Sequence, residues 1–177
     1  MAGEKYWYAV HTASRAEKKV AERLKAAGVE HYLPILVEMR EWSDRKKKVE
    51  VPAINGYVFV RIQHNQIVNI RKVPGVAFFL YEGGVPAIIP DVQIRTLRLM
   101  VDTTDSEFEL LPECLEPGQT VLITRGPMNG VIGELVEVSG KHKVMVRIQH
   151  IGCAMASVPR SCIEVLPAGS PASNSDQ

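Results

Sequence analysis

The chain has 177 residues, which is enough for one ordinary domain or two small ones. A hydrophobic fraction of 46% supports a buried core and argues against wholesale disorder. The formal net charge is only +1, so nucleic acid cannot be held by overall charge and any such contact must come from local basic patches. We see no signal peptide and no apolar stretch near the ~20 residues of a membrane span, so we expect a cytoplasmic protein without membrane contact.

The sequence contains no arrangement that predicts catalysis, a cofactor or a metal site. Cys114, Cys153 and Cys162 are odd in number and far apart, and none forms a CxxC pair. A disulfide framework and a zinc site are therefore poorly supported, and thiols in a reducing cytosol are the better interpretation. The GxSxG and HExxH motifs are absent. We expect a protein that is not an enzyme.

Strand and helix patterns alternate in the first part of the chain, which indicates an α+β fold. Tyr6 to Thr12 is aromatic and β-branched and predicts a strand. Ser14 stands three residues before Glu17, the spacing of a capping box, so a helix is expected to start there and to end before Gly28. Tyr57 to Ile62 alternates like a second strand of a mixed sheet.

Five further segments are predicted in this part of the chain. They are an extended run, a polar turn rich in lysine, a short helix, a hairpin around Gly83-Gly84 and a helix that follows Pro90. In that order they cover residues 30–41, 43–48, 66–71, 76–89 and 90–101.

Composition changes at residue 102. Six acidic residues and no basic residue occur from Asp102 to Glu116, so residues 104–116 are predicted to form an acidic linker. Five short strand-like runs with glycine turns follow and predict a small five-stranded β-barrel over residues 117–166. The predicted organisation is thus an N-terminal domain (1–103), the linker, the barrel and a disordered tail (167–177).

Two groups of motifs resemble the NusG family of transcription elongation and antitermination factors. The first resembles the family's N-terminal (NGN) domain and comprises Trp7-Tyr8, Glu17-Lys18-Lys19, Tyr32-Leu33-Pro34 and Gly56-Tyr57-Val58-Phe59-Val60. The second resembles the KOW motif of its SH3-like C-terminal barrel and comprises Gly118, Gly126, Pro127, Gly130 and Gly133. The resemblance spans residues 6 to 166 and implies a polymerase-binding factor that catalyses no reaction.

Within the family, two segments resemble the specialised antiterminators of the UpxY type, which act on polysaccharide operons in Bacteroidetes-like bacteria. They are Trp42 to Lys47 and Gly152 to Met155. The sequence departs from the general factor at Asn55, where a proline is common, and at Met128, where the KOW loop usually has phenylalanine. A general NusG-type elongation factor and an RNA- or ribosome-binding KOW protein remain the alternatives.

The resemblance implies that the N-terminal domain binds the clamp helices of RNA polymerase and suppresses pausing or termination. The candidate contacts are five aromatic residues: Trp7, Tyr8, Tyr57, Phe59 and Phe79. The alternative is that these rings are core residues of a sheet, as aromatics in strands usually are. Alternation along a strand places Tyr57 and Phe59 on one face, and Trp7 and Tyr8 on opposite faces.

Basic residues supply a candidate DNA contact. Arg15, Lys19 and Arg23 are spaced by four and would share one face of the first helix. They are predicted either to contact the non-template DNA strand or to form an ordinary solvated face. The predicted turn Arg45 to Lys48 also has two interpretations. Its charges either serve solubility or contact upstream duplex DNA. The KOW barrel is expected to recruit a ribosomal or termination protein, and the chain is expected to be a monomer.

Overall fold

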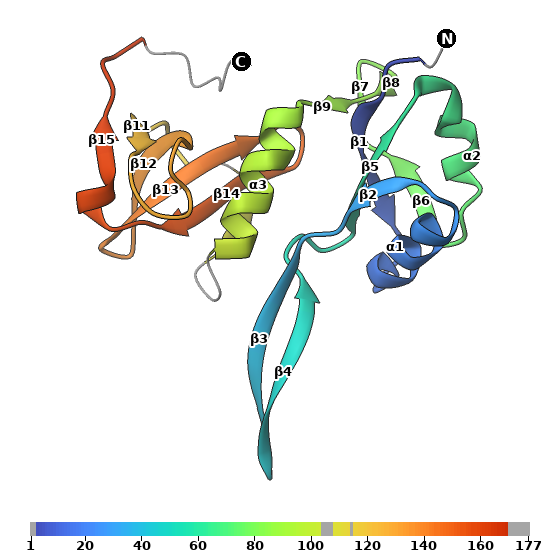
Figure 1. Ribbon diagram of the computed structural model, residues 1–177, viewed down its shortest axis with the longest axis horizontal. Helices are drawn as coiled ribbons and strands as arrows, with labels where there is room; N and C mark the ends of the chain where they lie inside the picture. The colour runs from blue at the N-terminus through green and yellow to red at the C-terminus, as the bar shows by residue number, and fades with distance from the viewer. Residues whose placement is uncertain (1–2, 104–107, 114, 170–177) are drawn as a thin grey trace. The chain divides into compact units, whose positions relative to one another are not determined.

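The computed structural model describes residues 3–103, 108–113 and 115–169 (Figure 1). The fold is α+β, as predicted, with three α-helices and many strands in this part of the chain. It divides into two compact units, which comprise Met1–Ile35 with Ile54–Asp91, and Leu36–Ala53 with Val92–Gln177. Among the described residues, no helix combines the length and the apolar character that crossing a membrane requires.

The first unit is built on a sheet in which strands follow the order β2-β5-β1-β6, with β9 also pairing with β1. All described pairings are antiparallel, so the prediction of a mixed sheet is wrong. The strands predicted at the start of the chain and from Tyr57 to Ile62 are both present. The five strands are β1 Tyr6–Thr12, β2 Glu30–Tyr32, β5 Tyr57–Ile62, β6 Val76–Phe79 and β9 Ile88–Ile89.

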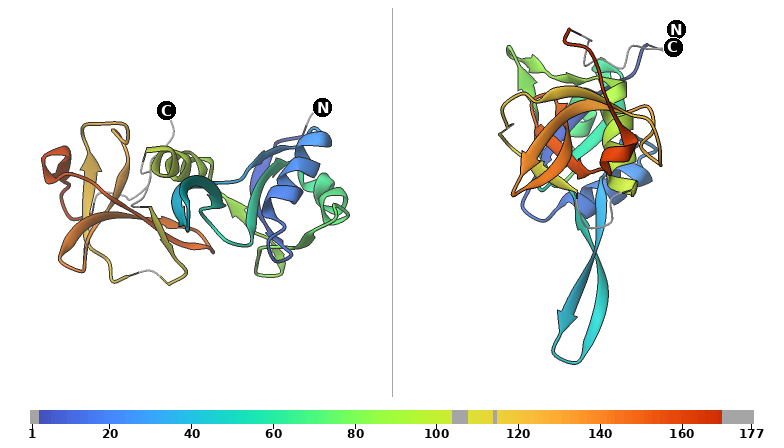
Figure 2. Two further views of the ribbon diagram at one scale, coloured as in Figure 1. Left: turned by 90° about the horizontal axis from the view of Figure 1, so that it is seen from below. Right: turned by 90° about the vertical axis from the view of Figure 1, so that its left-hand side faces the viewer.

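Helices α1 (Glu17–Ala26) and α2 (Ile67–Arg71) pack on one face of this sheet (Figures 1 and 2). Val20 and Leu24 recur at helical spacing on α1, and both are fully buried. They join a single cluster with the inward side chains of the sheet, namely Tyr8, Val10, Val58, Val60, Ile62 and Phe79, and with Ile67 and Ile70 of α2. This cluster is the core of the first unit.

The start of α1 differs from the predicted capping box. Ala16 is the N-cap residue and no side chain caps the helix. Glu17 instead turns inward, is only 6% exposed, and accepts a hydrogen bond of 2.7 Å from the backbone N–H of Gly56. The spacing of Ser14 and Glu17 was misleading. The Glu17 carboxylate accepts a hydrogen bond from the distant Gly56 N–H and not from the backbone at the start of its own helix. At the other end, Gly28 has a φ of +68° and ends the helix as predicted.

Two hairpins interrupt the main pattern. β3 (Ile35–Trp42) and β4 (Arg45–Pro52) pair only with each other, so Arg45 to Lys48 lie in a strand and not in the predicted turn. The turn itself is Ser43-Asp44. The hairpin predicted around Gly83-Gly84 is confirmed by β7 (Tyr81–Glu82) and β8 (Val85–Pro86).

The second unit contains α3 (Asp91–Thr103) and a six-stranded antiparallel sheet. The strand order is β10-β14-β13-β12-β11-β15, an open path in which closure into a barrel is not shown. The strands are β10 Glu109–Leu111, β11 Gln119–Ile123, β12 Ile132–Val138, β13 Lys141–Ile148, β14 Gly152–Ser157 and β15 Ile163–Val165.

Strand β10 lies inside the segment predicted to be linker, whose residues 104–107 and 114 fall outside the described part of the chain. The sequence analysis missed this strand because it lies within an acidic segment. In the structure, Glu109 forms an ion pair of 2.9 Å with the buried Lys143 of β13. Pairing between β10 and β14 then brings the count to six strands instead of five. Most of the predicted tail, residues 170–177, also falls outside the described part.

The cysteines differ from expectation at one position. Cys162 is free, whereas Cys153 is fully buried and disulfide-bonded. The odd number and wide spacing of the cysteines had favoured free thiols. Sequence spacing says little about a disulfide, because the bond depends on which positions the fold brings within reach.

Loss of the Glu17 carboxylate should destabilise the first unit. Glu17→Ala leaves the Gly56 N–H without its acceptor, and we expect a loss of about 1–3 kcal/mol in the free energy of unfolding. Glu22→Ala on the exposed face of the same helix is the matched control. Urea denaturation measures both variants, and equal midpoints for the two would contradict the role given to Glu17.

Candidate functional site

Two of the predicted aromatic contacts lie on the helix-covered face of the sheet. Tyr8 and Phe79 meet edge to face, with ring centroids 6.0 Å apart and an interplanar angle of 78°. Both are almost fully buried, and burial raises the pKa of Tyr8. In this conformation they stabilise the core and offer no surface to a partner.

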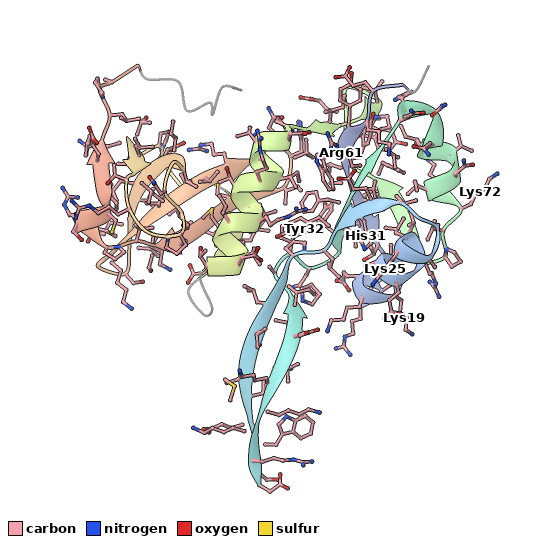
Figure 3. All side chains as sticks on the ribbon, in the orientation of Figure 1. Lys19, Lys25, His31, Tyr32, Arg61 and Lys72 are labelled. Carbon is pink, nitrogen blue, oxygen red and sulfur yellow. The ribbon has the colours of Figure 1, made fainter. Side chains whose placement is uncertain are left out.

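Trp7 and Phe59 lie on the opposite face, since neighbouring residues of a strand point to opposite sides. Both are also buried. Phe59 stacks on Tyr32, with centroids 6.2 Å apart, and Figure 3 shows Tyr32 where β2 ends. Beside Trp7, Arg61 forms ion pairs with Glu30 at 3.6 Å and with Asp91 at 3.2 Å. This end of the face is therefore occupied by intramolecular contacts.

The other end of the same face carries a group of three rings, which we name the His11 cluster: His11, Tyr57 and Phe78. His11 stacks on Phe78 with centroids 4.6 Å apart and an interplanar angle of 2°. Tyr57 meets the same imidazole edge to face at 5.0 Å. Phe78 is 49% exposed, and His11 and Tyr57 are half-buried.

The register of the sheet creates this cluster. β1 pairs with β5 so that His11 lies opposite Tyr57, and with β6 so that His11 lies opposite Phe78. A hydrogen bond from the Thr12 N–H to the Gly56 carbonyl, 2.8 Å long, holds the same end of β1. Gly56 has a φ of +79°, which favours glycine, and a Cβ there would lie 3.2 Å from His11 Nε2, so a larger residue would push the imidazole slightly away.

The structure thus brings Tyr57 to a partly accessible surface and places the other four predicted aromatics in the core. Sequence reasoning missed His11 and Phe78. Period-two alternation does require Phe78 and Phe79 to point to opposite faces, but it does not tell which face the helices cover. The polymerase contact assigned to all five residues stays a prediction, and its strongest member on structural grounds is Tyr57.

The predicted DNA-binding residues do not form one helical stripe. Arg15 precedes α1 and has a φ of +57°, so its spacing to Lys19 is not helical. Arg23 donates a hydrogen bond of 2.5 Å to the carbonyl of Pro74, which attaches α1 to the turn before β6. Arg15 and Lys19 are exposed, and Figure 3 shows Lys19 on α1. Their contact with DNA stays a prediction, while Arg23 has a structural role.

The KOW-like residues have clear conformational roles in the second unit. Gly126 and Gly130 adopt φ values of +84° and +90°, which favour glycine. Gly118 and Gly133 lie too close to neighbouring backbone for a side chain, and Pro127 lies in the turn between β11 and β12. These residues therefore shape turns and strand packing. In the same turn, Met128 is buried.

A second ion pair, beside that of Glu109 and Lys143, joins strands of the second unit. The guanidinium of Arg147 on β13 donates two hydrogen bonds to the Glu134 carboxylate on β12, at 2.7 and 3.1 Å, and these bonds raise the pKa of Arg147. Glu134 also accepts the Gly118 N–H at 3.2 Å. The described residues contain no cluster of His, Cys, Asp or Glu side chains that could hold a metal ion.

Comparison with known families identifies the chain. Residues 5–98, more than half of its length, match the family model described as transcription termination factor NusG. The chain belongs to the NusG family. Similar members of the family are described as transcription termination/antitermination proteins.

Relatives and a solved structure cover most of the chain. The NusG of Bacillus subtilis is 29% identical over 168 residues, which cover 84% of this chain and 91% of the relative. The NusG of Rickettsia bellii is 27% identical over 158 residues, covering 81% and 82% of the two chains. A structure described as domain interaction in Thermotoga maritima NusG aligns with a TM-score of 0.52 at 26% identity, covering 93% of this chain and 98% of that one.

The division between core and surface aromatics predicts different effects of alanine substitutions. Phe59→Ala should lower the free energy of unfolding by about 3–5 kcal/mol, because it leaves a cavity in a buried site. Phe78→Ala should lower it by less than about 1.5 kcal/mol, because half of that side chain is already in water. Chemical denaturation of both variants tests the assignment, and a larger loss for Phe78→Ala would reverse it.

Proposed function

We propose that this NusG-like transcription termination/antitermination factor binds the clamp helices of RNA polymerase through the His11 cluster and thereby suppresses pausing or termination. The carrying observation is the exposed ring of Phe78, which is stacked on His11, in a sheet where Trp7, Tyr8, Phe59 and Phe79 are buried. Aromatic side chains that are accessible and held in place are typical anchors of protein–protein interfaces. Tyr57 is the member of this cluster that the sequence analysis also gave as a candidate polymerase contact.

The geometry of the cluster favours binding in a second way. His11 is held between Phe78 and Tyr57, so these side chains have little conformational freedom left to lose when a partner covers them. An apolar helix surface can cover the face of Phe78 while the sheet beneath it stays unchanged. The cluster is therefore suited to dock a preformed helical element.

No reaction is required for such a factor to act. A protein that binds the closed clamp more tightly than the open one shifts the polymerase toward the closed, elongating state. The size of the shift is set by the difference between the two affinities. The first unit supplies the docking surface in this proposal, and Arg15 and Lys19 supply an electrostatic attraction to the non-template DNA strand.

The operon-specific role on a polysaccharide operon belongs to the same proposal and rests on the sequence resemblance of the segments Trp42 to Lys47 and Gly152 to Met155. A general elongation factor is the alternative, and it is favoured by the names of the relatives.

The burial of Met128 argues that its turn does not offer a large apolar side chain to a ribosomal or termination protein. A second partner of the KOW region would then use other residues.

Removal of the Phe78 ring should weaken binding to core RNA polymerase. An aromatic anchor contributes about 2 kcal/mol, so Phe78→Ala is expected to raise the Kd by about 30-fold, and Tyr57→Ala should act in the same direction. Val68→Ala is the matched control, because Val68 is an exposed apolar residue on α2. Titration of fluorescently labelled protein with core polymerase measures the Kd. Normal binding by folded Phe78→Ala and Tyr57→Ala variants would place the docking surface elsewhere.

The exposed cations make a separate prediction about DNA. The double variant Arg15→Ala/Lys19→Ala should keep its affinity for core polymerase but lose recruitment to a paused elongation complex, and the difference should shrink as salt rises. Lys5→Ala/Lys18→Ala removes the same charge from other surface positions and is the control. Recruitment is measured at two salt concentrations. Equal recruitment of both double variants and the unmodified protein would make Arg15 and Lys19 ordinary solvated residues.

A further inference from the structure

A shallow depression in the second unit plays no part in the proposed polymerase contact. It has a volume of about 550 Å³ and lies where β13 begins and β14 ends. None of the KOW-like glycines lines it. The turn of residues 149–151 joins the other ends of the same two strands, roughly 23 Å away along β13. The lining residues are Lys141, His142, Ser157, Val158, Pro159 and Arg160.

The lining combines positive charge with apolar surface. Lys141 and Arg160 are exposed cations, and His142 adds an exposed imidazole that can donate a hydrogen bond. None of these three forms an ion pair within the part of the chain that the structure describes. Val158 and Pro159 supply the apolar surface, and Val158 is buried. Such a site suits a ligand that carries both negative charge and apolar groups.

Two tight connections hold the backbone that carries the cations. Ser139 and Gly140, with φ values of +52° and +74°, form a two-residue turn directly before the first residue of β13. On the other side, η2 (Arg160–Cys162) is a single 3₁₀ turn before β15. The Cys162 carbonyl accepts the Thr124 N–H at 2.8 Å, which fixes this turn to the end of β11. A backbone held in this way loses little conformational freedom when a ligand binds.

The chemistry of the lining favours a peptide over a nucleic acid. Proteins that bind single strands stack the bases on aromatic side chains, and none of the six lining residues is Phe, Tyr or Trp. Binding of a duplex requires an extended basic stripe, whereas the carboxylate of Glu137 lies opposite His142 across the β12–β13 pair. A guanidinium such as that of Arg160 pairs well with a carboxylate, because two parallel hydrogen bonds can form.

We propose that this depression binds a short acidic segment of a protein partner, with its carboxylates on Lys141 and Arg160 and an apolar side chain against Val158. The volume lies within the range of sites that hold small ligands, so the partner would be recognised through a few side chains. The inference goes beyond the proposed polymerase contact, because it concerns the other unit and shares no residue with the His11 cluster.

Fluorescence anisotropy of labelled synthetic peptides tests the proposal on the full chain. The probe is a peptide that alternates acidic residues with leucine. One control peptide carries the amide in place of every carboxylate, and a second carries glycine in place of every leucine. We expect the probe to bind about tenfold more tightly than the amide peptide and to lose affinity as salt rises. The glycine peptide should bind more weakly than the probe, because it loses the apolar contact.

Variants with equal loss of charge locate the contact. Lys141→Ala/Arg160→Ala should weaken binding of the probe about tenfold, since each exposed ion pair contributes up to about a fivefold change in affinity. Lys25→Ala/Lys72→Ala removes the same charge from exposed positions of the first unit, which Figure 3 labels, and should leave binding unchanged. Lys141→Glu/Arg160→Glu should reject the probe and instead bind a peptide that alternates lysine with leucine, a reversal that loss of structure would not produce.

Polymerase takes no part in these experiments, so their failure is separate from failure of the docking on the His11 cluster. A Kd of the probe above about 1 mM, equal binding of the amide peptide, or equal loss in the two alanine variants would overturn the proposal. Labelled oligo(rU) and oligo(dT) are titrated in parallel, and tighter binding of either one than of the probe would assign the depression to nucleic acid instead. Because the peptide comparisons use the unmodified protein, they decide the proposal even where circular dichroism shows that a variant is misfolded.

Discussion

Strand β1 is the element on which the first unit depends, because it is paired on both edges and buried on both faces. β5 lies along one edge and β6 and β9 along the other, and the four consecutive residues Trp7 to Val10 are buried. Burial on two faces explains why this run lacks the polar alternation of a half-exposed strand. It also means that most aromatic rings of the sheet are committed to packing. Where β1 ends, at His11, the exposed ring of Phe78 reaches the surface beside His11 and Tyr57.

A buried polar contact holds that end of the strand. Glu17 on α1 accepts the Gly56 N–H, the Gly56 carbonyl accepts the Thr12 N–H, and His11 packs against Gly56. Helix, loop and strand are thereby joined directly beneath the His11 cluster. Since an interface anchor must be held in place to bind without a large entropic cost, this small network connects the stability of the fold to the proposed docking surface.

Much of this fold follows from local sequence signals, and the proposed sites follow from them less well. The strands from Tyr6 and Tyr57, the helix of α2 and the Gly83-Gly84 hairpin have strong local patterns, and all are present. The predicted capping box of Ser14 and Glu17 does not form, because the Glu17 carboxylate accepts the Gly56 N–H from another part of the chain. β10 was missed because its acidic residue, Glu109, is compensated by Lys143, which is far away in the sequence. Likewise, the choice between Phe78 and Phe79 depends on which face the helices cover, a property of the assembled sheet.

The most direct test of the central claim is amide hydrogen exchange of the full chain with and without core RNA polymerase. If the polymerase docks on the His11 cluster, amides in the segments around His11, Gly56 and Phe78 should become more protected in the complex. The hairpin residues 37–48 should change little under the same conditions. Protection that appears in the second unit, with none around His11, Gly56 and Phe78, would contradict the account.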